Sequence, residues 1–173
     1  DGGAFKKVAT TTKRTYTDTK ATAGAVCAYR VRALGSKTAY NSVFSQEVSL
    51  NVACTTPVIT GKTDAATGKP SLSWKKAAGA LSYEIYRSVD EGEYEYLTET
   101  TGTAFLDRQV QIAQDCSYKV IAIGREEVFN STESKPVQIT PVCPRPAAKG
   151  LIDASGKPTV TWEGVEGATG YAV

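Results

Sequence analysis

The chain has 173 residues, of which 41% are hydrophobic, and its 20 Lys and Arg against 18 Asp and Glu give a net charge of +2. This length holds one medium domain or two small ones, and the balanced charge does not point to nucleic acid or an anionic membrane as a partner. The apolar runs are short, so no membrane insertion is expected in this segment. The absence of His removes the commonest general base and the commonest metal ligand.

In chain order, the local patterns are those of strands. Gly, Pro, Asn and Asp cluster between the apolar runs and predict turns. No window keeps apolar residues at a helical period. Short strands separated by frequent turns predict an all-β protein built as a two-sheet sandwich. Alternation of apolar and polar residues predicts strands over 48–52, 71–74, 83–86, 116–122 and 137–139.

The chain also repeats itself. Residues 27–35 (CAYRVRALG) match residues 116–124 (CSYKVIAIG) at a spacing of 89 positions, and GKPSLSW, ending at Trp74, matches GKPTVTW, ending at Trp162, at a spacing of 88. Copies at such a period indicate a tandem array. The predicted organisation is the back part of a module at 1–53 (strands C′ to G), a complete module at 54–142, and the front part of a third module at 143–173 (strands A to C).

The order of motifs in the complete module carries a family resemblance. Trp74 closes a strand, a GAxxYxIYR segment follows at 79–87, and Asp107 precedes a YxVxA strand at 118–122. This order resembles the fibronectin type III module, whose strands are lettered A, B, C, C′, E, F and G. The resemblance implies tandem seven-stranded immunoglobulin-like sandwiches with incomplete modules at both ends. The style of the repeats is similar to that of bacterial secreted or cell-surface proteins.

Four cysteines allow three pairings. In the lettering of the family, Cys27 and Cys116 open strand F, while Cys54 and Cys143 follow strand G. These ends meet at one pole of a sandwich, which predicts the disulfides Cys27–Cys54 and Cys116–Cys143. The bridges would replace the Tyr that the family carries at the start of strand F. Buried free thiols are the alternative, and a zinc site is not expected without His or a CxxC pair. Disulfides imply an extracellular, secreted or cell-surface location.

Two aromatic residues fall at the tips of the predicted F–G loops, Tyr40 beside Asn41 and Phe129 beside Asn130. Loops on rigid sandwiches commonly carry binding, so these four residues form a possible binding loop. The alternative is that each aromatic ring folds back over its own hairpin. Trp74, as a strand residue, is expected in the core rather than on a sugar-stacking platform.

The function that follows is a non-enzymatic structural spacer or stalk of an extracellular or cell-surface protein, with no cofactor. The alternative is an adhesin-type module that recognises protein or glycan through the F–G and B–C loops. The expected partners are neighbouring repeats, because the two end segments are nearly complementary halves of one module. These halves are completed either by further sequence of a longer array or by another copy of the chain.

Overall fold

A computed structural model describes residues 3–173. Its centre is a sandwich of two antiparallel sheets, one with the strand order β3-β4-β7 and one with the order β6-β5-β8-β9. In the family's lettering these sheets are A-B-E and C′-C-F-G, so the predicted all-β sandwich is confirmed. We call residues 54–142 the central module. Its strands are β3 (Ile59–Thr63), β4 (Pro70–Trp74), β5 (Ser82–Val89), β6 (Glu95–Thr100), β7 (Ala104–Leu106), β8 (Cys116–Ile123) and β9 (Val137–Ile139).

The alternating pattern predicted at 116–122 corresponds to the two faces of β8. Cys116, Tyr118, Val120 and Ala122 are buried, and the residues between them are partly exposed. Successive side chains of a strand point to opposite faces of the sheet, so β8 gives one row of side chains to the core. The strand pairs with β5 along its whole length, which places the GAxxYxIYR motif beside it in the same sheet.

Trp74 lies in the core, as its strand position predicts. It is buried, and its ring meets the ring of Tyr83 edge-on at a centroid separation of 5.4 Å. The Tyr83 hydroxyl accepts a hydrogen bond from the Ala77 backbone N–H at 2.8 Å. The Tyr of the GAxxYxIYR motif therefore fixes the turn between β4 and β5 from inside the module.

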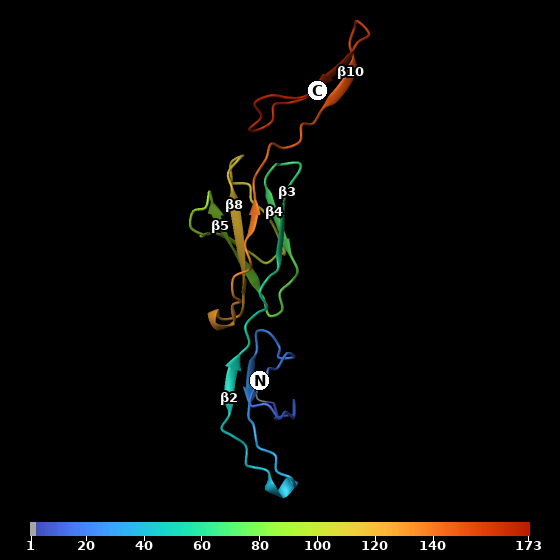
Figure 1. Cartoon of the computed structure of the whole chain (residues 1–173). Coiled ribbons are helices and arrows are strands. Elements are labelled where there is room, and N and C mark those ends of the chain that lie inside the picture. The colour runs from blue at the N-terminus through green and yellow to red at the C-terminus, as the bar shows by residue number, and fades with distance from the viewer. Residues whose placement is uncertain (1–2) are drawn as a thin grey trace.

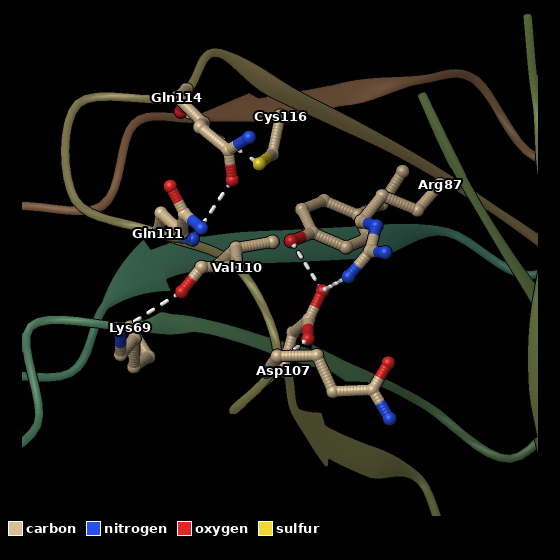
Figure 2. Close-up of polar contacts among 9 residues, drawn as sticks. Lys69, Arg87, Asp107, Val110, Gln111, Gln114 and Cys116 are labelled. Carbon is tan, nitrogen blue, oxygen red and sulfur yellow. Dashed lines mark hydrogen bonds and ion pairs between the residues drawn. The ribbon is translucent and has the colours of Figure 1, made fainter. Parts of the chain in front are cut away.

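A corner tyrosine, Tyr118, is present two residues after Cys116 in strand F. The Tyr118 hydroxyl donates to the Asp107 carboxylate at 2.9 Å, and an Arg87 guanidinium N–H donates to the same oxygen at 2.8 Å. Asp107 is 1% exposed, and Figure 2 shows Arg87 reaching it. The expectation that Cys116 replaces this tyrosine is wrong, because Tyr118 points inward from the same face of β8 and already holds the corner.

Outside the central module, the described residues form two separate hairpins. β1 (Val26–Tyr29) pairs with β2 (Val48–Asn51), and β10 (Lys149–Ile152) pairs with β11 (Pro158–Thr161). The strands C′ and E expected before β1, and the strand C expected after β11, are not formed in residues 3–173. The central module shows the reason. Its strand β5 holds both β6 and β8 in one sheet, so strand C′ has no partner where strand C is missing.

The third segment nevertheless keeps the turn geometry of the central module. The rings of Trp162 and Tyr171 lie 5.3 Å apart, and the Val165 backbone N–H donates to the Tyr171 hydroxyl at 2.7 Å. These are the counterparts of the contacts at Trp74, and they form although no strand follows β11 in the described residues. The repeated sequence therefore fixes this turn locally.

The three parts lie one after another along the chain (Figure 1). The β1–β2 hairpin is at one end, the sandwich is in the middle and the β10–β11 hairpin is at the other end. Short 3-10 turns at Thr38–Tyr40 and Glu127–Phe129 lie in the loops after β1 and β8. None of the helices in residues 3–173 could cross a membrane.

Candidate functional site

The junctions between the parts are the candidate functional site. At the first junction, Gly79 in the β4–β5 turn lies against the backbone of Ala23 and Gly24. A Cβ at position 79 would come within 2.9 Å of the Gly24 nitrogen. Gly79 and Gly24 also have positive φ angles of 83° and 77°, a conformation that other residues rarely adopt. Both turns therefore need glycine for their own shape and for their close approach.

The second junction uses the same pair of turns. Gly167, in the turn after β11, lies against Ile112, and a Cβ at position 167 would be 3.0 Å from the Ile112 Cβ. Ile112 follows Ala23 by 89 positions and Gly167 follows Gly79 by 88, which are the spacings of the repeat. Two independent junctions thus bring the same two turns together.

An ion pair adds to the second junction. The Lys69 ammonium lies 2.9 Å from the Glu166 carboxylate and donates to the Val110 carbonyl at 2.8 Å; Figure 2 shows Lys69 and Val110. Lys69 is buried while Glu166 is largely exposed. A pair of this kind contributes about 0–1 kcal/mol, so its main effect is to orient the third segment on the central module.

The two linkers, residues 52–58 between β2 and β3 and residues 140–148 between β9 and β10, are hydrogen-bonded to the sandwich rather than free. The Cys54 backbone N–H donates to the Phe129 carbonyl at 2.8 Å, and the Thr55 N–H donates to the Ala78 carbonyl at 3.0 Å. After β9, the Val142 N–H donates to the Gly68 carbonyl at 3.0 Å. Backbone hydrogen bonds of this kind shorten the part of each linker that can rotate.

The predicted disulfides are not formed, and all four cysteines are free thiols. Cys27 lies opposite Leu50 in the β1–β2 pair, and Cys54 follows Leu50 by four residues. Four extended residues span about 13 Å, whereas the two Cα atoms of a disulfide lie within about 7 Å. The same spacing separates Cys143 from Ile139, the cross-strand partner of Cys116. The prediction placed Cys54 just after strand G at the same pole as Cys27, but its side chain is buried in the core of the central module.

We therefore expect the thiols to react in the order of their exposure. Cys143 is exposed, whereas burial raises the pKa of the Cys54 and Cys116 thiols and reduces their thiolate fraction. An alkylating reagent should label Cys143 first and label Cys54 and Cys116 at least about tenfold more slowly. Peptide mapping of timed samples measures this order. An intact mass two hydrogens lower for each bridge, restored by reductant, would contradict it.

The F–G loops fold back on themselves. The side-chain carbonyls of Asn41 and Asn130 accept hydrogen bonds from the backbone N–H groups of Gly35 (3.0 Å) and Gly124 (2.9 Å). Phe129 is 2% exposed, and its carbonyl is the acceptor for the linker at Cys54 described above. The structure thus gives Asn41, Asn130 and Phe129 internal roles, as in the alternative interpretation of these loops.

Tyr40 differs from its counterpart Phe129. It is 65% exposed, although its position in the repeat is the same. In the central module the linker covers this pole, and no such segment covers it in residues 3–53. The exposure of Tyr40 therefore reflects a missing neighbour, and the loop sequence alone does not account for it. The B–C turn at Gly79 is occupied by the first junction.

The residues 3–173 contain no cluster of three or more His, Cys, Asp or Glu that could hold a metal ion. A shallow groove lies between the first linker and β4, lined by Thr55, Pro57, Thr60, Trp74 and Lys75. It brings no acid–base pair together, and a nucleophilic hydroxyl there has no His partner.

Comparison with known proteins gives a short sequence match and several structural ones. No protein-family model matches the chain. A segment of 68 residues, 38% of this chain, is 40% identical to an amylopullulanase of Thermoanaerobacterium saccharolyticum, and the chain spans 5% of that protein's length. An Fn3-like protein from Clostridium thermocellum is 24% identical, with 51% of this chain and 91% of that chain covered and a TM-score of 0.43.

A further solved structure is a β-1,2-glucanase from Parabacteroides distasonis. It is 20% identical, with 59% of this chain and 16% of that chain covered and a TM-score of 0.45. The fold is defined by the strand order of the central module, A-B-E in one sheet and C′-C-F-G in the other.

Proposed function

We propose that this chain, whose fold is of the fibronectin type III kind, is a non-enzymatic spacer that holds successive modules at a fixed angle. The observation that carries the proposal is the recurrence of one contact at two junctions. Gly79 meets the Ala23–Gly24 turn, and Gly167 meets the turn at Ile112. A contact that recurs at the period of the repeat gives every junction the same geometry, and equal junctions produce a stalk of constant pitch.

The way in which the loops are used supports a spacer over an adhesin. The B–C turn of the central module lies in the first junction, and its F–G loop accepts a hydrogen bond from the linker. The B–C turn is thus engaged in a junction, and the F–G loop, although its residues 125–128 are exposed, holds the linker through the Phe129 carbonyl. Inter-domain contacts of modest size permit relative motion by default, so the linker hydrogen bonds and the Lys69 ion pair are needed to limit it.

The end segments fit this proposal as parts of further modules. Val31 is 72% exposed, while its counterpart Val120 in the central module is 0% exposed. The inner face of the β1–β2 hairpin therefore lacks the strands that β3 and β4 supply in the central module. We propose the division 1–53, 54–142 and 143–173, with the missing strands supplied by further sequence or by a second copy.

The proposed location is outside the cell or on its surface. The match to a short part of a much longer amylopullulanase supports a place among the accessory modules of large, multi-domain proteins. The free thiols neither require nor oppose this location. The resemblance to bacterial secreted proteins remains its main support.

A prediction about the junctions tests the proposal. Gly79→Val should release the first junction, because the new side chain would overlap the backbone of Gly24. We expect a broader distribution of particle lengths by small-angle X-ray scattering and of end-to-end distances by single-molecule fluorescence. Gly167→Val should do the same at the second junction.

Gly156→Val is the matched control. Gly156 also has a positive φ, 79°, but a Cβ there would meet nothing within 4 Å. This variant carries the backbone strain of the turn without the overlap at a junction. Scattering profiles of Gly79→Val and Gly167→Val that match the wild type would contradict the spacer proposal, as would an equal change in Gly156→Val.

A further inference from the structure

A cluster of stacked cations lies on the first segment, outside the junctions. The Arg30 guanidinium lies 4.2 Å from the ring centre of Phe5 and 4.3 Å from that of Phe44, and the Arg32 guanidinium lies 4.9 Å from the Phe44 ring. We call Phe5, Arg30, Arg32 and Phe44 the arginine cluster. All four residues are exposed. Within residues 3–173, neither arginine has an ion pair or a side-chain hydrogen bond to protein.

The cluster lies on the outer face of the hairpin. Cys27 and Tyr29 are partly buried and alternate with exposed residues along β1, and the same alternation carried onward places Arg30 and Arg32 on the exposed side. Their counterparts at the 89-residue spacing, Lys119 and Ile121, also lie on the outer face of β8. Strands that complete the first module would therefore cover the opposite face and leave the cluster open.

In the central module, the charge at the equivalent position is neutralised by an ion pair. Lys119 replaces Arg30, Tyr94 replaces Phe5 and Glu133 replaces Phe44. The Lys119 ammonium lies 4.1 Å from the Tyr94 ring centre and 2.8 Å from the Glu133 carboxylate. Its charge is thus already paired. In the first segment a phenyl ring stands where the acid stands in the central module, so the arginine charge has no internal partner.

A stacked guanidinium is prepared for an anion. Its central carbon lies over the rings, and its N–H donors form a planar fork that fits carboxylate, sulfate or phosphate. The rings also restrict the side chain, which lowers the ordering cost of binding. Arg30 and Arg32 directly follow β1. Residues two apart in extended backbone are separated by about 6–7 Å, so the two arginines together fit a ligand with repeated anionic groups.

The charge of the surrounding segment adds to this preference. Residues 1–53 hold eight Lys and Arg against three Asp and Glu, while the central module holds nine against twelve. The net charge of the whole chain hides this asymmetry. A segment with a large excess of one sign attracts polymers of the opposite sign and speeds their encounter.

We propose that the arginine cluster binds an anionic polysaccharide that carries carboxylate or sulfate groups. The choice of polymer rests on the surface location in the proposed function, whereas the anion site itself does not. Single-stranded nucleic acid binds to aromatic faces by base stacking, and here guanidinium groups occupy faces of both rings. A protein partner usually brings a buried apolar anchor, and this cluster offers a charged surface.

Binding of the whole chain to immobilised polymers tests the inference. Heparin supplies sulfate with carboxylate, polygalacturonate supplies carboxylate alone, and dextran is the neutral control. We expect binding to one or both anionic glycans, and none to dextran. The paired change Arg30→Gln with Arg32→Gln should weaken binding by at least about tenfold and reduce its dependence on salt. Lys119→Gln, which removes a charge that is already paired, should change binding by less than about twofold.

Comparison with the central module suggests two decisive variants. Phe44→Glu gives Arg30 the partner that Lys119 has and should also weaken binding by about tenfold. Ile121→Arg combined with Glu133→Phe builds the cluster on the folded central module and should strengthen binding even if the first hairpin is disturbed by its own substitutions. Equal binding by all variants, tighter binding to duplex DNA or polyglutamate, or no binding to either glycan would overturn the inference. The scattering profile of Arg30→Gln with Arg32→Gln should match the wild type, which separates this result from the spacer proposal.

Discussion

Phe129→Ala should destabilise the central module by about 3–5 kcal/mol, the usual cost of removing a fully buried phenyl ring. Phe129 is 2% exposed, and it closes the pole at which the linker enters through Cys54. Loss of the ring opens a cavity beneath the linker. Urea unfolding measures the effect, with Trp74 fluorescence as the probe in a Trp162→Phe background, so that a single tryptophan reports on the central module.

The matched substitution in the first segment should do little. Tyr40→Ala removes a ring at the same position of the repeat, but this ring is 65% exposed. We expect the free energy of unfolding of the central module to stay within about 0.5 kcal/mol of the wild type. If Tyr40→Ala and Phe129→Ala had equal effects, burial beneath the linker would not be the source of the stability.

Asp107→Ala should be equally damaging, by about 3–5 kcal/mol. The carboxylate is buried and accepts hydrogen bonds from Arg87 and Tyr118 at 2.8 and 2.9 Å. Its removal leaves a largely buried guanidinium and a buried hydroxyl without partners. The counterpart in the first segment is the control. Asp18 accepts from Tyr29 at 3.1 Å and has no arginine partner in residues 3–173, so Asp18→Ala should leave the unfolding of the central module unchanged.

The same corner determines how the central module responds to high pH. Burial, with the nearby Asp107 charge, raises the pKa of Tyr118 well above its ordinary value. The unfolded phenol ionises near pH 10, whereas the folded one keeps its proton. The stability from this group is complete below pH 10 and is lost above it by about 1.4 kcal/mol per pH unit. Tyr118→Phe should reduce the slope of unfolding free energy against pH by about 1 kcal/mol per pH unit between pH 10 and 11. An unchanged slope would show that Tyr118 is not held neutral by the fold.

Much of the fold could be predicted from local sequence. The period-two patterns at 71–74, 83–86 and 116–122 correspond to β4, β5 and β8, because alternation indicates which side chains face the core. The repeat also placed Trp74 and its turn correctly. In residues 3–173, the strands C′ and E expected before β1 and the strand C expected after β11 did not form, because a strand needs a neighbour to satisfy its backbone and bury its side chains.

The cysteines show where this kind of prediction fails. The pairing of Cys27 with Cys54 assumed that Cys54, just after strand G, lies beside the start of strand F. Strand pairing stops at Asn51, and the Cys54 side chain is buried in the central module. The two cysteines are placed symmetrically about the F–G loop in the sequence. A disulfide, however, requires that their Cα atoms come within a few ångströms of each other. The corner was misplaced for a similar reason, since only the inward direction of Tyr118 shows that it reaches Asp107.

The sequence by itself determined the two-sheet sandwich, the repeat and the absence of the usual catalytic motifs, because these depend on periodicity and residue type. Only the tertiary structure decided how residues at equivalent positions are used. Phe129 is buried and Tyr40 is exposed because a linker covers one pole and not the other. Lys119 is neutralised and Arg30 is not, because a glutamate faces one and a phenyl ring faces the other. Burial and charge pairing depend on neighbours distant in the chain, and local patterns do not record them.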